Sequence, residues 1–314
     1  MNNNSDITEL GDLAIGMRAA YARGENAMEY ARKMSNTDVN SSVATLIAYD
    51  LQAGSYIANA KSDPKAREHW CNQLAAILNP YVTTESAILE VGCGEATTLA
   101  GVLNRLNNKP MQALGFDISW SRCAHGLTWL KENEASARLF VADLFDIPLG
   151  DASVDVVYTS HSIEPNGGRE EAAIKELLRV AGRVVVLIEP LYELASANAQ
   201  ARMRSHGYVQ HLKATAESLG AVVHDYRLLD YCANPLNPSG LMLIKKTAAN
   251  LSKSSTIQWR CPLTHTPLIE NSSGFFSPKT GIIYPVLAGI PLLRSNHAVV
   301  ASSFEQLNFL RRLP

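Results

Sequence analysis

The sequence has little excess charge, few cysteines and no long hydrophobic run. Lys and Arg number 28 and Asp and Glu number 30, which gives a formal net charge of -2. Because proteins that neutralise many phosphates usually carry a basic excess, this balance disfavours a nucleic-acid partner. The five cysteines are odd in number and scattered, so they predict a reducing compartment rather than a disulfide framework. The best apolar run, Val184–Ile188, has the length of a strand and is too short to span a bilayer.

Composition and length limit the architecture. The opening residues, MNNNSDITEL, lack the apolar segment of a secretory signal, so we expect a cytoplasmic protein with no membrane partner. A chain of 314 residues with 46% hydrophobic side chains can bury a sizeable core and favours one main domain with additions. We expect a helical extension or lid over residues 1–85, the main domain over 86–250, and a small β-rich module with a closing helix over 258–314.

The main domain alternates short apolar runs with amphipathic stretches. This alternation predicts an α/β fold with a doubly wound, mainly parallel sheet covered by helices on both faces. Strands are expected at Ala87–Val91, Ala113–Asp117, Ala137–Ala142, Val154–Thr159, Arg183–Glu189, Ala221–Leu229 and Leu241–Lys245. Helices are expected at Thr97–Asn107, Trp120–Glu132 and Gly168–Ala181, with Gly182 as the C-cap of the last. Ligands of such sheets bind beyond the carboxyl ends of the strands.

The strongest motif is a glycine turn after the first expected strand. Glu90 ends the strand, and Gly92, Cys93 and Gly94 follow it before a helix begins. The two glycines allow a tight turn and a close approach of a ligand to the backbone. Position 97 is Thr, so the GxGxxG fingerprint of dinucleotide sites is not matched. The carboxylate of Glu90 would repel a pyrophosphate but attract a sulfonium or an α-ammonium. The alternative is a purely structural turn with Glu90 in solvent.

Acids also end the next two expected strands. Asp117 is placed where an acid can accept hydrogen bonds from both hydroxyls of a ribose. Asp143 is placed where an acid can accept from the exocyclic amine of an adenine, with apolar neighbours against the ring. The predicted cofactor-binding residues are Glu90, Gly92, Cys93, Gly94, Asp117, Ile118, Asp143, Leu144 and Ser160.

These residues resemble the class I S-adenosylmethionine-dependent methyltransferases. The segment 90–94 is similar to the first motif of that family, Asp117 to its ribose acid, and Asp143 to its adenine-contacting acid. The resemblance extends over roughly residues 87–248 and departs at Ala96, where a third glycine is common. It implies a seven-stranded sheet with an antiparallel last strand, and S-adenosyl-L-methionine as the cofactor.

A dense polar cluster, Tyr158–Arg169, follows the fourth expected strand. His161 is the preferred general base or substrate orienter, because the ordinary pKa of histidine lies near working pH. Glu164 can pair with it or bind a substrate cation. This pair resembles the His and the Glu three residues later of the small-molecule branch of the family, although Pro165 replaces a following His. The alternative is structural: His161 hydrogen-bonds the turn and Glu164 caps the next helix.

Further substrate contacts are expected on both sides of this cluster. Segments after the fifth strand commonly cover the substrate side of such sheets, and arginines there can bind a carboxylate or a phosphate. Residues 49–56, ahead of the first strand, can form a lid, with a packing role as the alternative. The candidate substrate residues are Tyr56, Asn166, Tyr192, Arg202 and His206.

In the C-terminal module, the segments 261–264 and 277–280 have a CxxC-like spacing, but only Cys261 is a thiol. Together with the apolar run 283–293, these segments resemble a short zinc ribbon of the kind found in a small activator subunit of methyltransferases. Cys261 and His265 make two zinc ligands at most. Zinc needs about four N or S ligands, so we expect no metal and a degenerate ribbon held by apolar packing. Its expected job is to cover an edge of the sheet or to form a homodimer contact. A closing helix is expected over Val300–Leu310, with Phe304 and Leu307 inward.

The patterns together predict an enzyme that transfers a methyl group from S-adenosylmethionine to an oxygen or nitrogen of a small molecule, such as a sugar or another biosynthetic intermediate. One alternative is an RNA or protein methyltransferase, which a contiguous basic surface would favour. Another is a binding module without catalysis, which the loss of Glu90, Asp117 and Asp143 would mark; all three acids are present. An NAD-linked oxidoreductase is disfavoured by the charge of Glu90. The sequence leaves the acceptor and the oligomeric state open.

Overall fold

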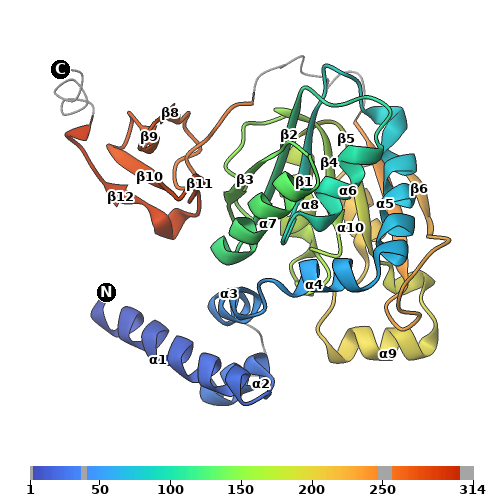
Figure 1. The fold of residues 1–314 in the computed structure, drawn as a ribbon, viewed down its shortest axis with the longest axis horizontal. Coiled ribbons are helices and arrows are strands. Elements are labelled where there is room, and N and C mark those ends of the chain that lie inside the picture. The colour runs from blue at the N-terminus through green and yellow to red at the C-terminus, as the bar shows by residue number, and fades with distance from the viewer. Residues whose placement is uncertain (1–2, 37–40, 247–256, 305–314) are drawn as a thin grey trace.

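The computed structural model describes residues 3–36, 41–246 and 257–304. At its centre lies a seven-stranded sheet with the strand order β3-β2-β1-β4-β5-β7-β6 (Figure 1). The strands are β1 (Ala87–Val91), β2 (Gln112–Asp117), β3 (Arg138–Val141), β4 (Val154–Ser160), β5 (Ala181–Pro190), β6 (Val223–Leu228) and β7 (Ser239–Lys245). β1 to β5 pair in parallel, whereas β7 is antiparallel to both β5 and β6. The predicted sheet, with its antiparallel last strand, is confirmed.

Helices cover both faces of the sheet. On one face lie α5 (Pro64–Leu78), α6 (Thr97–Arg105) and α7 (Trp120–Glu132), and on the other α8 (Glu170–Val180) and α10 (Leu212–Ser218). Successive side chains of a strand point to opposite faces. Ile88 of β1 therefore packs in the core with α5 to α7, and its neighbour Leu89 packs in the core with α8 and α10. Burial on both faces explains why the strands are continuous apolar runs rather than alternating ones.

Four helices precede α5: α1 (Asn3–Ala22), α2 (Ala27–Met34), α3 (Ser42–Leu51) and α4 (Ser55–Ser62). α1 and α2 lie away from the sheet (Figure 1), and a small core around Met17 joins them to α3. Asp63 caps α5 by accepting a hydrogen bond from the Ala66 amide, with Pro64 in the first turn. No helix among the described residues is long and apolar enough to cross a membrane.

The C-terminal module is a five-stranded antiparallel unit beside the main sheet. It comprises β8 (Ile269–Asn271), β9 (Gly274–Ser277), β10 (Ile282–Leu287), β11 (Ile290–Pro291) and β12 (Val299–Val300). Leu292 pairs with Val141 of β3, and the Leu293 amide donates to the Val141 carbonyl at 2.8 Å. The module thus covers the β3 edge of the sheet, which would otherwise present unpaired backbone groups.

The side chain of Cys261 is buried inside this module. Its Sγ lies 3.3 Å from the hydroxyl oxygen of Tyr284, and both residues are buried. Within the described parts of the chain, no three His, Cys, Asp or Glu side chains gather in a way that could hold a metal ion. Apolar and aromatic packing holds the unit together, including the edge-on contact of Trp259 with Phe275.

Some sequence expectations need correction or fall outside the described residues. Gly182 lies inside β5 rather than at a helix C-cap, because α8 ends at Val180 and the strand begins at once. A side chain at Gly182 would place its Cβ 3.1 Å from the Ala152 carbonyl oxygen, so a close backbone approach explains the glycine. The start of the expected closing helix is wrong, since Val300 belongs to β12, where it pairs with β10. The rest of the expected closing helix falls on residues 305–314, which lie outside the described residues.

Candidate functional site

A cavity of about 530 Å³ lies at the carboxyl ends of β1, β2 and β4. Residues of α3, α4 and α5 enclose it from one side, and the loop 231–237 ahead of β7 encloses it from another. The structure brings most predicted site residues to this cavity. Its lining includes Tyr56, Glu90, Gly92, Cys93, Gly94, Asp117, Ile118, Asp143, Leu144, Ser160, His161 and Asn166.

Three predicted substrate residues do not line the cavity. Tyr192 contacts the guanidinium of Arg204, and the ring of His206 contacts the Arg202 carbonyl oxygen at 2.9 Å. Arg202 itself lies over the ring of Tyr208. The segment after β5 therefore contributes none of these three side chains to the cavity, whereas the loop ahead of β7 does line it. The substrate roles expected of Tyr192, Arg202 and His206 stay predictions.

The glycine turn after β1 has the backbone geometry that its sequence predicts. Gly92 and Gly94 have φ values of +65° and +54°, in the left-handed region that favours glycine. A side chain at Gly92 would put its Cβ 2.4 Å from the Cβ of Ser162, so no other residue fits there without a shift. The Gly94 amide donates to Asp117 Oδ2 at 3.0 Å, which ties the turn to the end of β2.

The acids of the cavity are more buried than the sequence alone indicates. Glu90 is 2% exposed, accepts a hydrogen bond from the Tyr158 hydroxyl at 2.9 Å, and burial raises its pKa to about 8. Burial also raises the pKa of Asp117, against the lowering effect of backbone hydrogen bonds from Ser119 and Gly94. Burial therefore favours the protonated form of Glu90, and a cation beside it would favour the charged form.

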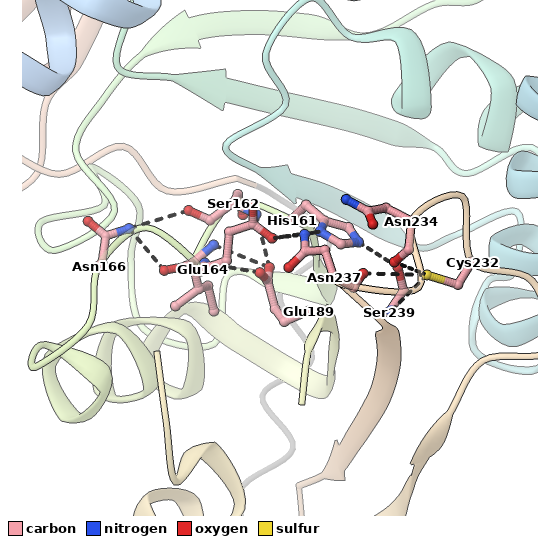
Figure 2. A network of polar contacts seen from close by, with 10 residues as sticks. His161, Ser162, Glu164, Asn166, Glu189, Cys232, Asn234, Asn237 and Ser239 are labelled. Carbon is pink, nitrogen blue, oxygen red and sulfur yellow. Dashed lines mark hydrogen bonds and ion pairs between the residues drawn. The ribbon is translucent and has the colours of Figure 1, made fainter. Parts of the chain in front are cut away.

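His161 is held at both ring nitrogens. Its Nδ1 lies 2.7 Å from Glu164 Oε2, and its Nε2 lies 2.7 Å from Ser239 Oγ (Figure 2). Burial lowers the pKa of His161, but the hydrogen bond and charge of Glu164 outweigh this, so that the pKa is raised overall. The hydrogen-bonded pair predicted from the sequence exists, and Glu164 stands behind His161 rather than in the cavity lining.

Glu189 fixes the backbone of His161. The φ of His161 is +57°, an uncommon value for a residue with a side chain. The buried carboxylate of Glu189, at the end of β5, accepts backbone hydrogen bonds from Ser162, Ile163 and Glu164 at 3.0 to 3.2 Å (Figure 2). Burial raises the pKa of Glu189 to about 7, although the charge of His161 opposes the rise. Glu189 thereby stabilises the strained turn that presents the imidazole.

The loop ahead of β7 completes this network. The amide of Asn237 donates to Glu164 Oε2 at 3.2 Å, and the Ser239 amide donates to Cys232 Sγ at 3.4 Å. Figure 2 shows these side chains converging on His161 from a segment far along the chain. Sequence reasoning missed Asn237, Ser239 and Glu189. The one available signal was that Glu189 is an acid at the end of an apolar strand.

Comparison with known proteins identifies a domain in the central part of the chain. Residues 88–183 match the family model described as a methyltransferase domain. The chain contains a methyltransferase domain. The predicted enzyme class, and S-adenosylmethionine as its cofactor, are thereby confirmed. No curated protein sequence matches the chain.

Several solved structures are similar to this chain at low sequence identity. An S-adenosylmethionine-dependent methyltransferase from Aquifex aeolicus is 14% identical with a TM-score of 0.41, over 54% of this chain and 87% of that one. Geranyl diphosphate C-methyltransferase from Streptomyces coelicolor is 13% identical with a TM-score of 0.43, over 55% and 80%. A chain from the complex of the Haloferax volcanii Trm112 methyltransferase activator with a methyltransferase is 15% identical with a TM-score of 0.48, over 63% and 96%.

Helix α4 is fastened directly to the glycine turn of the methyltransferase domain. The buried carboxylate of Glu95 accepts hydrogen bonds from the backbone amides of Gly54, Tyr56 and Ile57, at the N-terminus of α4. Glu95 also pairs with the buried guanidinium of Arg122 at 3.4 Å. The sequence offered a lid or a packing role for residues 49–56, and it gave no sign of the charged pair that holds this segment.

The pair also holds two tyrosines of the segment 49–56. The guanidinium of Arg122 lies over the rings of Tyr56 and Tyr49, at 4.2 and 5.1 Å from their centroids. The ring of Tyr56 in turn approaches Gly94, since a Cβ built there would lie 3.1 Å from it. Residues 49–56, the arginine and the glycine turn therefore pack as one wall of the cavity.

Proposed function

We propose that this protein transfers the methyl group of S-adenosylmethionine to an oxygen or nitrogen of a small molecule. The observation that supports this most is the position of His161, which lines the same cavity as the glycine turn while Glu164 holds its Nδ1. A base beside the donor pocket is what a hydroxyl or ammonium acceptor needs, because that acceptor loses a proton when it takes up a methyl group.

The residues at the ends of β1, β2 and β3 fit the donor. Gly92 and Gly94 leave the backbone open to close approach. The two carboxylate oxygens of Asp117 accept hydrogen bonds from the backbone amides of Gly94 and Ser119. When bound, S-adenosylmethionine supplies a methyl group activated by a positively charged sulfur. Glu90 and Asp117 would hold the donor at its cationic and ribose groups, and Asp143 would hold it at its adenine.

The size and lining of the cavity favour a small acceptor. About 530 Å³ lies within the usual range of small-molecule sites, roughly 300 to 1,000 Å³. The helices α4 and α5 and the loop 231–237 contribute residues to the lining of the cavity. The net charge of -2 and the scattered basic residues likewise give little attraction for a nucleic acid.

The test separates acceptors by size. The purified protein is incubated with S-adenosylmethionine labelled at the methyl group, together with either the low-molecular-mass fraction or the macromolecular fraction of a cell extract. We expect label in products of the low-molecular-mass fraction only. Label in the macromolecular fraction alone would support an RNA or protein acceptor instead. Binding of S-adenosylhomocysteine without transfer to either fraction would support a module without catalysis.

A further inference from the structure

His161 has no free nitrogen for the acceptor. Both ring nitrogens are hydrogen-bonded at 2.7 Å, Nδ1 to Glu164 and Nε2 to Ser239. A carboxylate only accepts hydrogen bonds, so the neutral imidazole carries its proton on Nδ1 and donates it to Glu164. Its Nε2 is then an acceptor, and the hydroxyl of Ser239 donates to it. His161 and Ser239 both line the cavity, so an acceptor proton that goes to Nε2 either passes through a contact with the Ser239 hydroxyl or needs that hydroxyl to move away.

Ser239 is placed to make that contact. It is the first residue of β7, it lines the cavity, and it pairs across the sheet with Pro190 at the end of β5. Its side chain is nearly buried, with 3% of the residue exposed, so its hydroxyl is fixed rather than free to rotate into bulk water. The Ser239 amide is also held, by Cys232 Sγ at 3.4 Å. The arrangement Ser239, His161, Glu164 has the order of a nucleophile, base and orienting acid.

We propose that Ser239 relays the proton of the acceptor to His161 during methyl transfer. This inference rests on the proposed function. As the acceptor oxygen or nitrogen forms its bond to the methyl carbon, the bond from that carbon to sulfur breaks and its electron pair stays on sulfur. The acceptor proton passes to Ser239 Oγ, and the proton of that hydroxyl passes to His161 Nε2. The imidazolium is stabilised by the carboxylate of Glu164, and Ser239 ends the step as a neutral hydroxyl.

A positioning role is the competing explanation for Ser239. In that case the hydroxyl only orients the ring of His161. It moves away from Nε2 when the acceptor binds, so that a single proton passes directly from the acceptor to Nε2. The two explanations differ in the number of protons that are being transferred at the transition state. The relay moves two protons together, whereas positioning moves one.

The experiment uses single turnovers with the full-length protein in excess over labelled S-adenosylmethionine, and the low-molecular-mass extract fraction as acceptor. The rate is measured in mixtures of H₂O and D₂O. For the relay we expect a bowed dependence on the deuterium fraction in the wild type. Ser239→Ala should lower the rate on the order of a hundredfold and give a straight line, while its affinity for S-adenosylhomocysteine stays unchanged. Ser239→Thr, which keeps the hydroxyl, should restore much of the rate and the bowed dependence.

A matched control is Ser153→Ala. Ser153 is a buried serine that donates to the Gly150 carbonyl at 2.8 Å and lies at the opposite end of β4 from the site. It should leave the rate and the isotope dependence as in the wild type. A straight line for the wild type, or an undiminished rate in Ser239→Ala, would overturn the relay. Absence of transfer by the wild type would instead count against the proposed function.

Discussion

The two sides of the cavity are built in different ways. The proposed donor side lies at the carboxyl ends of three neighbouring parallel strands, with Glu90, Gly92 and Gly94 at β1, Asp117 at β2 and Asp143 after β3. The proposed acceptor side joins three separate stretches of the chain, with His161 and Glu164 in the first, Glu189 in the second, and Asn237 and Ser239 in the third. On the donor side the turn is tied to an acid 23 residues away, whereas the bond between Ser239 and His161 joins residues 78 apart.

This difference bears on what each side can tolerate. The donor side presents much of its surface through backbone atoms, which the sheet holds in place whatever the neighbouring side chains are. On the acceptor side, a strained residue carries the reactive group, and the buried carboxylate of Glu189 holds its turn. We therefore expect substitutions on the acceptor side to change turnover, and substitutions on the donor side to change affinity for the donor.

The largest effect is expected at His161. His161→Ala removes the base, so turnover should fall by about 10²-fold to 10⁴-fold, while the affinity for S-adenosylhomocysteine changes little because the donor side is intact. Turnover is measured with labelled donor and the low-molecular-mass fraction, and affinity by calorimetry. His224→Ala, on the exposed part of β6, is the control and should leave both unchanged. Wild-type turnover in His161→Ala would leave His161 a structural role only.

The donor side was largely predictable because its information is local. The first strand was expected at 87–91 and lies there, and the acids Asp117 and Asp143 follow strands whose ends fall within a residue or so of expectation. In a parallel sheet, carboxyl ends meet at one edge, so residues placed after successive strands come together without further assumptions. The same reasoning found His161 and its partner Glu164, which are three residues apart in the turn after β4.

The remaining features of the site depend on contacts between residues far apart in the sequence, which no short sequence pattern contains. Glu189 acts by accepting hydrogen bonds from a turn 25 to 27 residues earlier. Ser239 reaches His161 only because β7 returns antiparallel beside β5. Arg202 was expected near the substrate from its place after β5, yet it does not line the cavity, whereas the loop ahead of β7 does. Burial is also invisible in the sequence, so the raised pKa of Glu90 could not be foreseen.

A smaller effect is expected at Asp117. Asp117→Ala removes the carboxylate that would accept the ribose hydroxyls and that also holds the Gly94 amide. The affinity for S-adenosylhomocysteine should fall roughly tenfold, about the loss of one charge-assisted hydrogen bond. Calorimetry measures it, with Asp225→Ala on β6 as the control, since Asp225 pairs with Arg227 and does not line the cavity. Unaltered affinity would mean that Asp117 does not contribute to binding of the donor.

The smallest effect, and the one that tests the electrostatics of the donor side, is a pH dependence of binding. Burial raises the pKa of Glu90 to about 8, so most of this carboxyl is protonated at neutral pH when the cavity is free. A cationic donor binds better to the ionised form, and binding therefore lowers the pKa and releases a proton. The affinity should rise severalfold from about pH 6 to about pH 8 and level off above the pKa of the free site.

The measurement is calorimetry with S-adenosylhomocysteine, which keeps the α-ammonium, in buffers of different ionisation enthalpy so that released protons are counted. Glu90→Gln is the matched variant, because the amide can still accept from the Tyr158 hydroxyl but has no proton to lose. This variant should lose the pH dependence while keeping the affinity that the wild type shows at low pH. If wild type and Glu90→Gln follow the same pH profile, Glu90 does not sense the charge of the ligand, and the attraction must come from Asp117 alone.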